Sequence, residues 1–326
     1  MEKKNLGKTD IRVTPVGIGT LTMGFSQKNL SVEEGCSIIR YAIDRGINFL
    51  DTAQYYDTYM YVRPALDSLK ADGRPLPVIC SKTLESDYDG ATDAVHQCLR
   101  DLDIDCVDIF LLHEVRGTAD FEARSGAWQA LKDLKTEGLV QAIGISTHHA
   151  DACAHMAETN NCDVVFALIN KDSLGIRTIR DGEDVPGSKE EMEQAIRRCS
   201  DEGLGVFTMK AFGGGNLIEN YIPCLDYASA VKGNSCVMIG MASMDQVDAA
   251  VDYFDKRLSP SYAPDISAKK LIIDQSDCEG CGTCKERCVS QAIYWNENGL
   301  ASIDSSKCVR CGYCAPVCPV RAIILL

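Results

Sequence analysis

Eight cysteines near the carboxyl end of the sequence have the spacing of iron–sulfur cluster ligands. They form two runs of the pattern C-x2-C-x2-C-x3-C, thirty residues apart: Cys278, Cys281, Cys284 and Cys288, then Cys308, Cys311, Cys314 and Cys318. Three thiolates two residues apart fit one loop around a single [4Fe-4S] cubane, whereas the fourth lies too far along to close the same cage and ligates the other cluster. The spacing therefore predicts two ligand sets: Cys278, Cys281, Cys284 and Cys318 for the first cluster, and Cys308, Cys311, Cys314 and Cys288 for the second.

Zinc bound to the CxxC pairs is the alternative interpretation of these cysteines. A zinc site needs four ligands with a longer gap between the pairs, and it explains neither the third CxxC step nor the Cys318-Pro319 ending. That ending resembles bacterial two-cluster ferredoxins. The first run has Val289 in place of the proline, which alters a turn but removes no ligand. A disulfide scaffold is disfavoured because eight of the 17 cysteines fall within residues 278–318.

The remaining cysteines lie mostly within apolar strand or helix patterns, which favours a role as small buried hydrophobes. Only Cys80 adjoins a candidate site residue, so only Cys80 is a candidate for thiol reactivity. The set is Cys36, Cys80, Cys98, Cys106, Cys153, Cys162, Cys199, Cys224 and Cys236.

A second group of polar residues stands where apolar strand patterns end. Asp51 ends GINFLD, Lys82 follows VICS, His113 ends DIFLLH, and Tyr56 lies in the loop after Asp51. A tyrosine with an ordinary pKa near 10 becomes a usable proton donor when a nearby ammonium favours its phenolate. We therefore expect Lys82 to favour the Tyr56 phenolate, Asp51 to anchor Lys82, and a neutral His113 to orient a carbonyl oxygen. Singly, each residue has an ordinary explanation as a helix cap, a solvated lysine or a core histidine; three at consecutive strand ends favour function.

The elements that must position these residues alternate between near-continuous apolar runs and amphipathic stretches, for example residues 31–44, 91–102, 125–136 and 189–202. This alternation predicts an α/β fold, a (β/α)8 TIM barrel whose active site lies at the carboxyl ends of its strands. A doubly wound open sheet is the alternative, but no GxGxxG follows the first strand. A hairpin of residues 4–6 and 11–13 is expected to close the bottom of the barrel. The expected strands cover residues 16–18, 48–50, 78–81, 108–112, 142–145, 164–169, 206–209 and 236–239.

Three segments follow from this pattern. Residues 1–257 are expected to form the barrel, the proline-containing residues 258–268 a linker, and residues 269–326 a small α+β domain of two similar halves, like a two-cluster ferredoxin.

The sequence from about residue 3 to 254 resembles the aldo-keto reductase family in GINFLDTAQYYD, ICSKT, IFLLHE and LKTEGLVQAIGIS. The resemblance implies a barrel that reduces carbonyls with NADPH, and it carries the family's catalytic residues over to Asp51, Tyr56, Lys82 and His113. A smaller group of that family has a C-terminal two-cluster domain, and this chain resembles that group throughout.

The cofactor-binding positions depart from the family pattern. Ser146 is kept, but Thr147 replaces an asparagine, Phe166 a glutamine and Met209 the stacking aromatic, so two amide contacts and one stack are lost. No basic residue lies in residues 239–250 to hold a 2′-phosphate. Lys210 adds a cation at the barrel mouth, although a solvated lysine is the simpler interpretation. A glycine run could cradle a phosphate or simply form a flexible turn: Gly213, Gly214 and Gly215.

A hydride carries two electrons whereas each cluster ordinarily takes one, so a mediator such as a flavin would have to connect NADPH with the clusters. The leading hypothesis is an oxidoreductase in which Tyr56 protonates a small-molecule substrate, with electrons from NADPH or from a ferredoxin-type partner. The alternatives are an electron-transfer or docking subunit whose barrel does not turn over, and clusters that are purely structural. The net charge of −14 argues against nucleic acid or anionic membranes as partners. No signal-peptide core or spanning segment is apparent, and a cytoplasmic location is expected.

Overall fold

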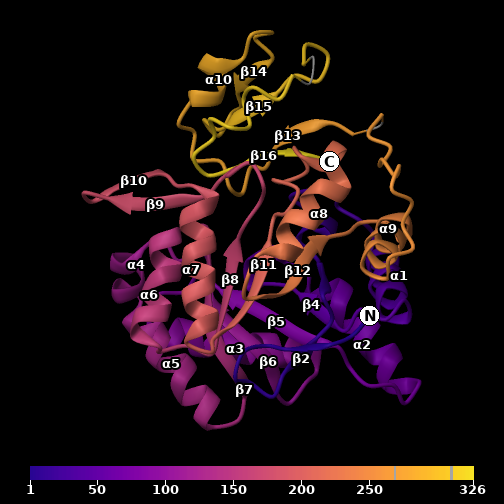
Figure 1. Cartoon of the computed structure of the whole chain (residues 1–326), viewed down its shortest axis with the longest axis vertical. Coiled ribbons are helices and arrows are strands. Elements are labelled where there is room, and N and C mark those ends of the chain that lie inside the picture. Colours follow the sequence, from indigo (N-terminus) through magenta and orange to yellow (C-terminus); the bar gives the residue numbers. More distant parts are fainter. Residues whose placement is uncertain (268, 309–310) are drawn as a thin grey trace.

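Eight parallel strands close into a barrel in the computed structural model, which describes residues 1–267, 269–308 and 311–326. Every expected strand overlaps one of them, so the (β/α)8 barrel is confirmed and the open sheet is wrong (Figure 1). In chain order the barrel strands are β3 (Val16–Gly19), β4 (Phe49–Asp51), β5 (Val78–Thr83), β6 (Val107–Leu112), β7 (Val140–Thr147), β8 (Val164–Leu168), β11 (Gly205–Met209) and β12 (Asn234–Gly240).

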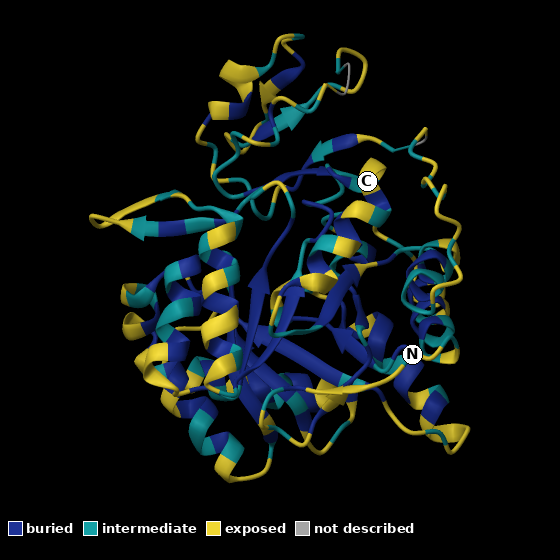
Figure 2. Cartoon of the chain, viewed as in Figure 1, coloured by how far each residue is buried: buried dark blue, intermediate teal, exposed yellow. Residues whose placement is uncertain are grey.

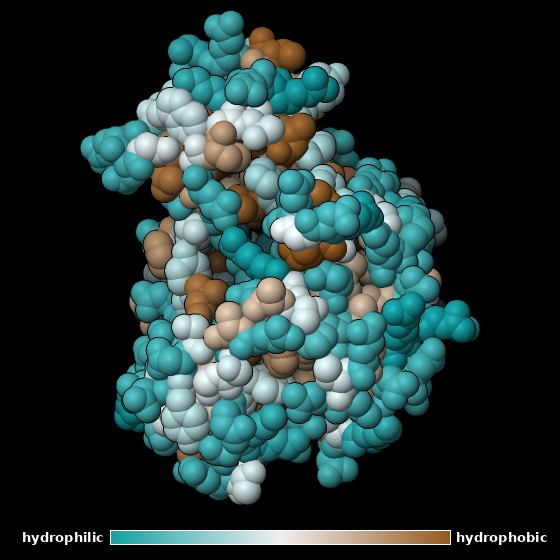
Figure 3. Space-filling view, turned by 90° about the vertical axis from the view of Figure 1, so that its left-hand side faces the viewer, coloured by the Kyte–Doolittle hydropathy of each residue, from teal (hydrophilic) through white to brown (hydrophobic). Residues whose placement is uncertain are grey.

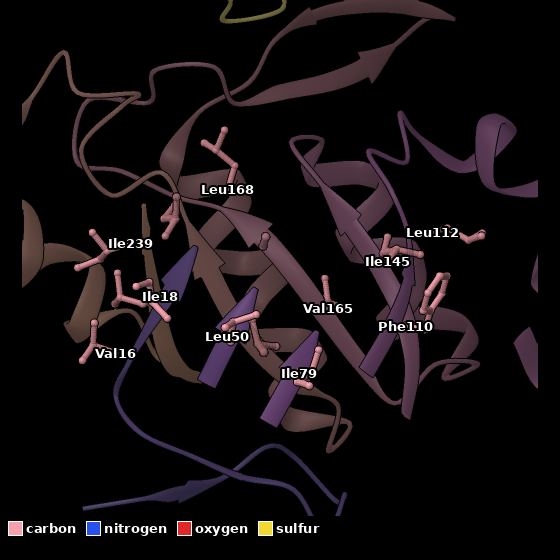
Figure 4. Close-up of a cluster of buried hydrophobic side chains, with 14 of the residues drawn as sticks. Val16, Ile18, Leu50, Ile79, Phe110, Leu112, Ile145, Val165, Leu168 and Ile239 are labelled. Atoms are coloured by element: carbon pink, nitrogen blue, oxygen red, sulfur yellow. The ribbon is translucent and has the colours of Figure 1, made fainter. Parts of the chain in front are cut away.

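Side chains of these strands alternate between two hydrophobic cores, because successive residues of a strand face opposite sides. Leu50, Ile79 and Val165 point outward into the layer between strands and helices (Figure 4). Phe49 and Phe207 point inward and meet edge to face at 5.0 Å. Both faces of the barrel sheet are buried (Figure 2), which explains its near-continuous apolar sequence.

Nine α-helices are described outside the small C-terminal lobe, and most of them alternate with the strands. Ser31 and Ser188 each form a capping box that begins a helix, α1 and α7 respectively. No described helix has the length and apolar character needed to span a bilayer. The helices are α1 (Val32–Asp44), α2 (Tyr59–Ala71), α3 (Tyr88–Leu102), α4 (Thr118–Ala123), α5 (Ser125–Thr136), α6 (Ala150–Thr159), α7 (Lys189–Asp201), α8 (Tyr221–Ala230) and α9 (Met244–Phe254).

Two antiparallel hairpins flank the barrel. The first pairs β1 (Lys4–Asn5) with β2 (Arg12–Val13), and its Leu6 and Ile11 are buried in the interior core, as expected for a plug at the bottom. The second pairs β9 (Arg177–Arg180) with β10 (Glu183–Pro186) between β8 and α7 and projects from the barrel (Figure 1). The sequence analysis had not anticipated this second hairpin.

The described residues of the C-terminal lobe form two antiparallel strand pairs and one short helix. β13 (Leu271–Ile273) pairs with β16 (Ile323–Leu325), β14 (Ile293–Trp295) pairs with β15 (Ala301–Ile303), and α10 (Thr283–Arg287) precedes β14. The lobe lies over the carboxyl ends of the barrel strands, and Figure 3 shows apolar side chains near the junction. The backbone N–H of Leu325 donates to the carbonyl oxygen of Gly214 at 3.0 Å, so the last strand is joined directly to a barrel loop.

The segment between barrel and lobe has no helix or strand in residues 258–267; residue 268, the last of the expected linker, lies outside the described residues. The segment is not a loose tether, because the Tyr262 ring packs edge to face on Tyr221 of α8 at 5.1 Å. The exact domain boundaries remain a prediction.

Candidate active site and cluster lobe

Three residues of the expected tetrad gather inside the barrel mouth because of strand alternation. Asp51, Lys82 and His113 each lie two residues beyond an inward-facing core side chain of the same strand, so they share its orientation. The three core side chains are Phe49, Cys80 and Leu111.

Lys82 and Asp51 form a buried ion pair at the carboxyl ends of β5 and β4. The Lys82 Nζ lies 2.7 Å from Asp51 Oδ1, and the two side chains are 1% and 6% exposed. The same Nζ donates to the carbonyl oxygen of Thr52 at 2.6 Å. Burial raises the pKa of Asp51, and the charge of Lys82 opposes that rise. The ammonium is therefore fixed by two acceptors.

Tyr56 ends the 3₁₀ turn η2 (Gln54–Tyr56) and completes the tetrad. Its hydroxyl forms a hydrogen bond with Nε2 of His113 at 3.3 Å, whereas the Lys82 Nζ lies over the face of its ring, 4.6 Å from the centroid. Burial, followed by the charges of Asp51 and Glu114, raises the pKa of Tyr56 well above 10. The Lys82 ammonium contacts Asp51, as expected, and also Thr52, and the phenol is held protonated; the expected effect of Lys82 on the Tyr56 phenolate stays a prediction.

His113 is held neutral. Burial and then the charge of Lys82 lower its pKa well below the ordinary value, in agreement with the expected neutral imidazole. Arg124, buried between α4 and α5, donates to the carbonyl oxygens of His113 at 2.8 Å and Thr83 at 3.0 Å. The sequence analysis missed this positioning arginine, which no local pattern distinguishes from a helical surface residue.

Two cavities meet at Tyr56. The first, of about 280 Å³, is lined by Tyr56, His113 and Ser146 of the barrel and by Cys278 and Pro319 of the lobe; we call it the cluster-side cavity. The second, of about 380 Å³, runs beneath the linker; we call it the linker-side cavity.

The linker-side cavity extends from the tetrad to the beginning of α9. Its lining includes Asp51 and Phe166 near the tetrad, and Ser243 and Gln246 at the far end. Pro264 of the linker also contributes to its lining. The cavity therefore joins the tetrad to residues at the beginning of α9.

Ser146 and Thr147 face different environments. Ser146 lines the cluster-side cavity, and its Oγ accepts the backbone N–H of Glu114 at 2.9 Å. Thr147 has the opposite orientation in β7, and its hydroxyl donates to the carbonyl oxygen of Val115 at 2.6 Å and accepts the N–H of His149 at 2.9 Å. Thr147 lines neither cavity, so the expectation that it binds cofactor is not supported.

Phe166 and Met209 form an apolar floor where the linker-side cavity approaches the tetrad. The Phe166 ring stacks on Phe207 at 4.3 Å and is 2% exposed. Neither side chain offers the hydrogen bond that a carboxamide needs, and therefore the residues fit the nicotinamide end of a dinucleotide poorly.

The glycine run after β11 contacts the lobe. Gly213, Gly214 and Gly215 all have left-handed backbones, with φ of 57°, 69° and 85°. A Cβ on Gly215 would lie 2.3 Å from the carbonyl oxygen of Leu325. Glycine at this position therefore allows the close approach of β16. Gly214 and Gly215 also line the linker-side cavity, and their role as a phosphate cradle stays a prediction.

Two lysines that the sequence analysis missed lie at the far end of the linker-side cavity. Lys28 follows the turn after β3 and Lys269 follows the linker, and both line this cavity. They are neighbours, because the charge of Lys28 adds to burial in lowering the pKa of Lys269. Residues 239–250 contain no basic side chain for a 2′-phosphate, but Lys28 and Lys269 bring two cations to the same cavity from other parts of the sequence.

The structure brings the first expected set of cluster cysteines together. Burial, followed by the charges of Cys318, Cys281 and Cys278, raises the pKa of Cys284 to about 11. The second expected set lines one cavity of the lobe: Cys288, Cys308, Cys311 and Cys314. The donor chemistry fits two cubanes, since each group offers four thiolates.

Within residues 1–267, 269–308 and 311–326, no three Cys, His, Asp or Glu side chains are placed to hold one metal ion. The choice between zinc and iron–sulfur clusters therefore rests on the spacing of the cysteines. The ligand assignment itself remains a prediction.

Replacing Cys311 by Ala should remove one of the two expected clusters. Iron should fall from about eight to about four atoms per chain, and the EPR signal of the reduced protein should simplify. Cys106→Ala, an exposed cysteine outside the lobe, is the control. Unchanged iron in the Cys311 variant, or stoichiometric zinc in the parent protein, would contradict the assignment.

Cys80, the candidate for thiol reactivity, lies near the tetrad, and two histidines follow β7. Cys80 is fully buried, and burial followed by the charge of Asp51 raises the pKa of its thiol well above 9, which opposes thiolate reactivity. His148 and His149 both line the cluster-side cavity, and the Nε2 of His149 lies 3.2 Å from Asp184.

Comparison with known proteins places both parts of the chain. Residues 15–223 match the model described as the aldo/keto reductase family, and residues 271–326 match the 4Fe-4S dicluster domain. A probable aldo-keto reductase 1 of Glycine max is 26% identical over 232 residues, which are 66% of this chain and 62% of that protein. An L-galactose dehydrogenase of Arabidopsis thaliana is 23% identical over 290 residues, 77% of this chain and 87% of that protein.

Among solved structures, the holo form of an aldo-keto reductase from Bacillus halodurans aligns with a TM-score of 0.64 at 20% identity. The alignment covers 80% of this chain and 93% of that chain. A likeness at this identity establishes the barrel fold alone.

Proposed function

Because the chain belongs to the aldo/keto reductase family and carries a 4Fe-4S dicluster domain, we propose that it reduces a carbonyl or related group of a small molecule at Tyr56. The observation that carries the proposal is the buried tetrad at the barrel mouth. Tyr56, His113 and the Lys82–Asp51 pair converge where two cavities meet.

Each side chain of the tetrad has its own role in a carbonyl reduction. Tyr56, protonated at neutral pH, donates its proton to the carbonyl oxygen, while the neutral His113 at 3.3 Å orients that oxygen. Lys82 lies close enough to stabilise the phenolate left behind, and Asp51 keeps its ammonium in place. A carbonyl that gains a hydride and this proton becomes an alcohol, so the atoms balance.

The linker-side cavity supports NADP(H) as electron donor. Bound there, the dinucleotide would supply a hydride. Lys28 and Lys269 suit its phosphate end, whereas Phe166 gives no polar contact to its nicotinamide.

A ferredoxin-type protein is the second donor that we consider, and one observation favours it. Cys278, an expected ligand of the first cluster, lines the same cavity as Tyr56 and His113. Bound clusters would each supply one electron, so in this route two electrons and a second proton, from water, would take the place of the hydride. An expected cluster ligand and the residue expected to donate the proton therefore line the same cavity.

Anaerobic assays with the fully loaded protein test the proposal. One arm offers NADPH and the other a chemically reduced ferredoxin. Each arm includes a panel of small aldehydes, ketones and aldoses, with L-galactose and its lactone included because of the name of the Arabidopsis relative. We expect alcohol formation in one arm, with quenching of nicotinamide fluorescence if the donor is NADPH. No product with either donor, from protein with full iron and a folded barrel, would overturn the proposal.

A further inference from the structure

Arg321 is a buried arginine without a hydrogen-bond partner. It lies in the lobe just before β16, it is 5% exposed, and neither Nη1 nor Nη2 has a partner within the described residues. A buried guanidinium is costly unless an acceptor satisfies it. Because Arg321 lines the linker-side cavity, its unpaired donors indicate a ligand that supplies the acceptor.

Two barrel loops make room for this side chain. A Cβ on Gly175, in the loop after β8, would lie 1.2 Å from Cδ of Arg321. A Cβ on Gly214, in the loop after β11, would lie 3.0 Å from Nη2. Arg321 itself has a left-handed backbone with φ of 59°, which is strained for a non-glycine residue. The Arg321 side chain therefore lies between the loop after β8 and the loop after β11.

Lys210 is a second cation at the same place. It is the first residue after β11, has φ of 61° and lines both cavities. Burial and then the charge of Arg321 lower its pKa to about 8, which shows that the two cations are neighbours. The side chain of Lys210 makes no hydrogen bond or ion pair among the described residues, whereas its carbonyl oxygen accepts the N–H of Gly213 at 2.8 Å. Two neighbouring cations in a buried cavity repel each other, and an anion between them would relieve that repulsion.

The acidic side chains that act on both cations form no ion pair with either of them among the described residues. The charge of Asp277 acts on both Lys210 and Arg321, but no ion pair joins it to either one within the described part of the chain. Glu114 also acts on both, and it is partly exposed. The two cations therefore face the linker-side cavity without an acidic partner, and a bound molecule in that cavity could supply the acceptor.

We propose that Lys210 and Arg321 form an anion-binding subsite where the two cavities join, and that it takes a phosphate, diphosphate or carboxylate group of the bound molecule. Arginine suits such groups because its fork donates two parallel hydrogen bonds. The inference rests on the proposed function and deepens it: the anionic group belongs either to a dinucleotide in the linker-side cavity or to the substrate beside Tyr56. One of the two cations comes from the lobe, so the lobe itself completes the binding site.

Calorimetric titration of the loaded protein under anaerobic conditions tests the subsite. Inorganic pyrophosphate serves as the probe for a nucleotide diphosphate, and succinate as the probe for a substrate carboxylate. We expect Arg321→Gln and Lys210→Gln each to weaken binding of at least one probe about tenfold or more. Arg116→Gln is the matched control, since Arg116 lines the cluster-side cavity but already pairs with Glu279 at 3.0 Å.

The probe that binds identifies the source of the anion. Pyrophosphate alone indicates the dinucleotide, and succinate alone indicates the substrate. No binding of either probe to the parent protein, or full affinity in Lys210→Gln, would overturn the subsite. Iron analysis accompanies each variant, and if Arg321→Gln loses iron then Lys210→Gln, which changes only the barrel, decides the outcome. Because binding is measured without turnover, an inactive protein that binds a probe would refute the proposed function and keep the subsite.

Discussion

Tyr56→Phe should lower kcat by about 10²- to 10⁴-fold, the usual contribution of a positioned general acid. The substitution removes only the hydroxyl, which forms a hydrogen bond with Nε2 of His113, and leaves the ring over Lys82. Without that proton, the developing alkoxide has no acid at its oxygen. The readout is steady-state turnover with the donor and substrate that the assays identify, together with the affinity for each.

The matched control for this substitution is Tyr88→Phe. The Tyr88 hydroxyl donates to Asp133, and neither residue lines either cavity, so its loss should leave turnover within about twofold of the parent protein. The outcome distinguishes the competing functions. If the barrel only docks a partner or carries electrons, Tyr56→Phe should not change turnover. Equal turnover in Tyr56→Phe and Tyr88→Phe would therefore show that the Tyr56 hydroxyl takes no part in the reaction.

Much of the fold was predictable because each barrel strand carries its own signal. Apolar runs such as residues 107–112 and 164–168 are buried on both faces, which gives them a continuous hydrophobic sequence. The same regularity placed three site residues at strand ends. Applied more strictly, alternation would also have corrected Thr147: it is one residue out of phase with the inward-facing Ala142, whereas Ser146 is in phase.

The features that sequence reasoning missed depend on segments that meet only in the folded chain. Arg321 lies 111 residues after Lys210, and Lys28 lies 241 residues before Lys269, yet each pair shares one cavity. No spacing rule connects such residues. The raised pKa of Tyr56 was missed for a related reason: the sequence predicts the contact between Asp51 and Lys82, but only the structure shows the burial that raises the pKa of the phenol.

Separating Asp51 from Lys82 should cost more stability than removing both. Either Asp51→Leu or Lys82→Met alone leaves one charge buried without its partner, and we expect a loss of about 3–5 kcal/mol in the free energy of unfolding. The double variant replaces the pair with apolar side chains beside the interior core, so it should regain most of that loss.

All three variants should also turn over slowly, because Lys82 would no longer be held beside Tyr56 to stabilise its phenolate. Urea unfolding followed by circular dichroism, with iron content checked, measures the first effect, and turnover measures the second. A double variant as unstable as the single ones would show that the pair stabilises the barrel by packing rather than by charge; a double variant with parental turnover would show that the pair has no part in the reaction.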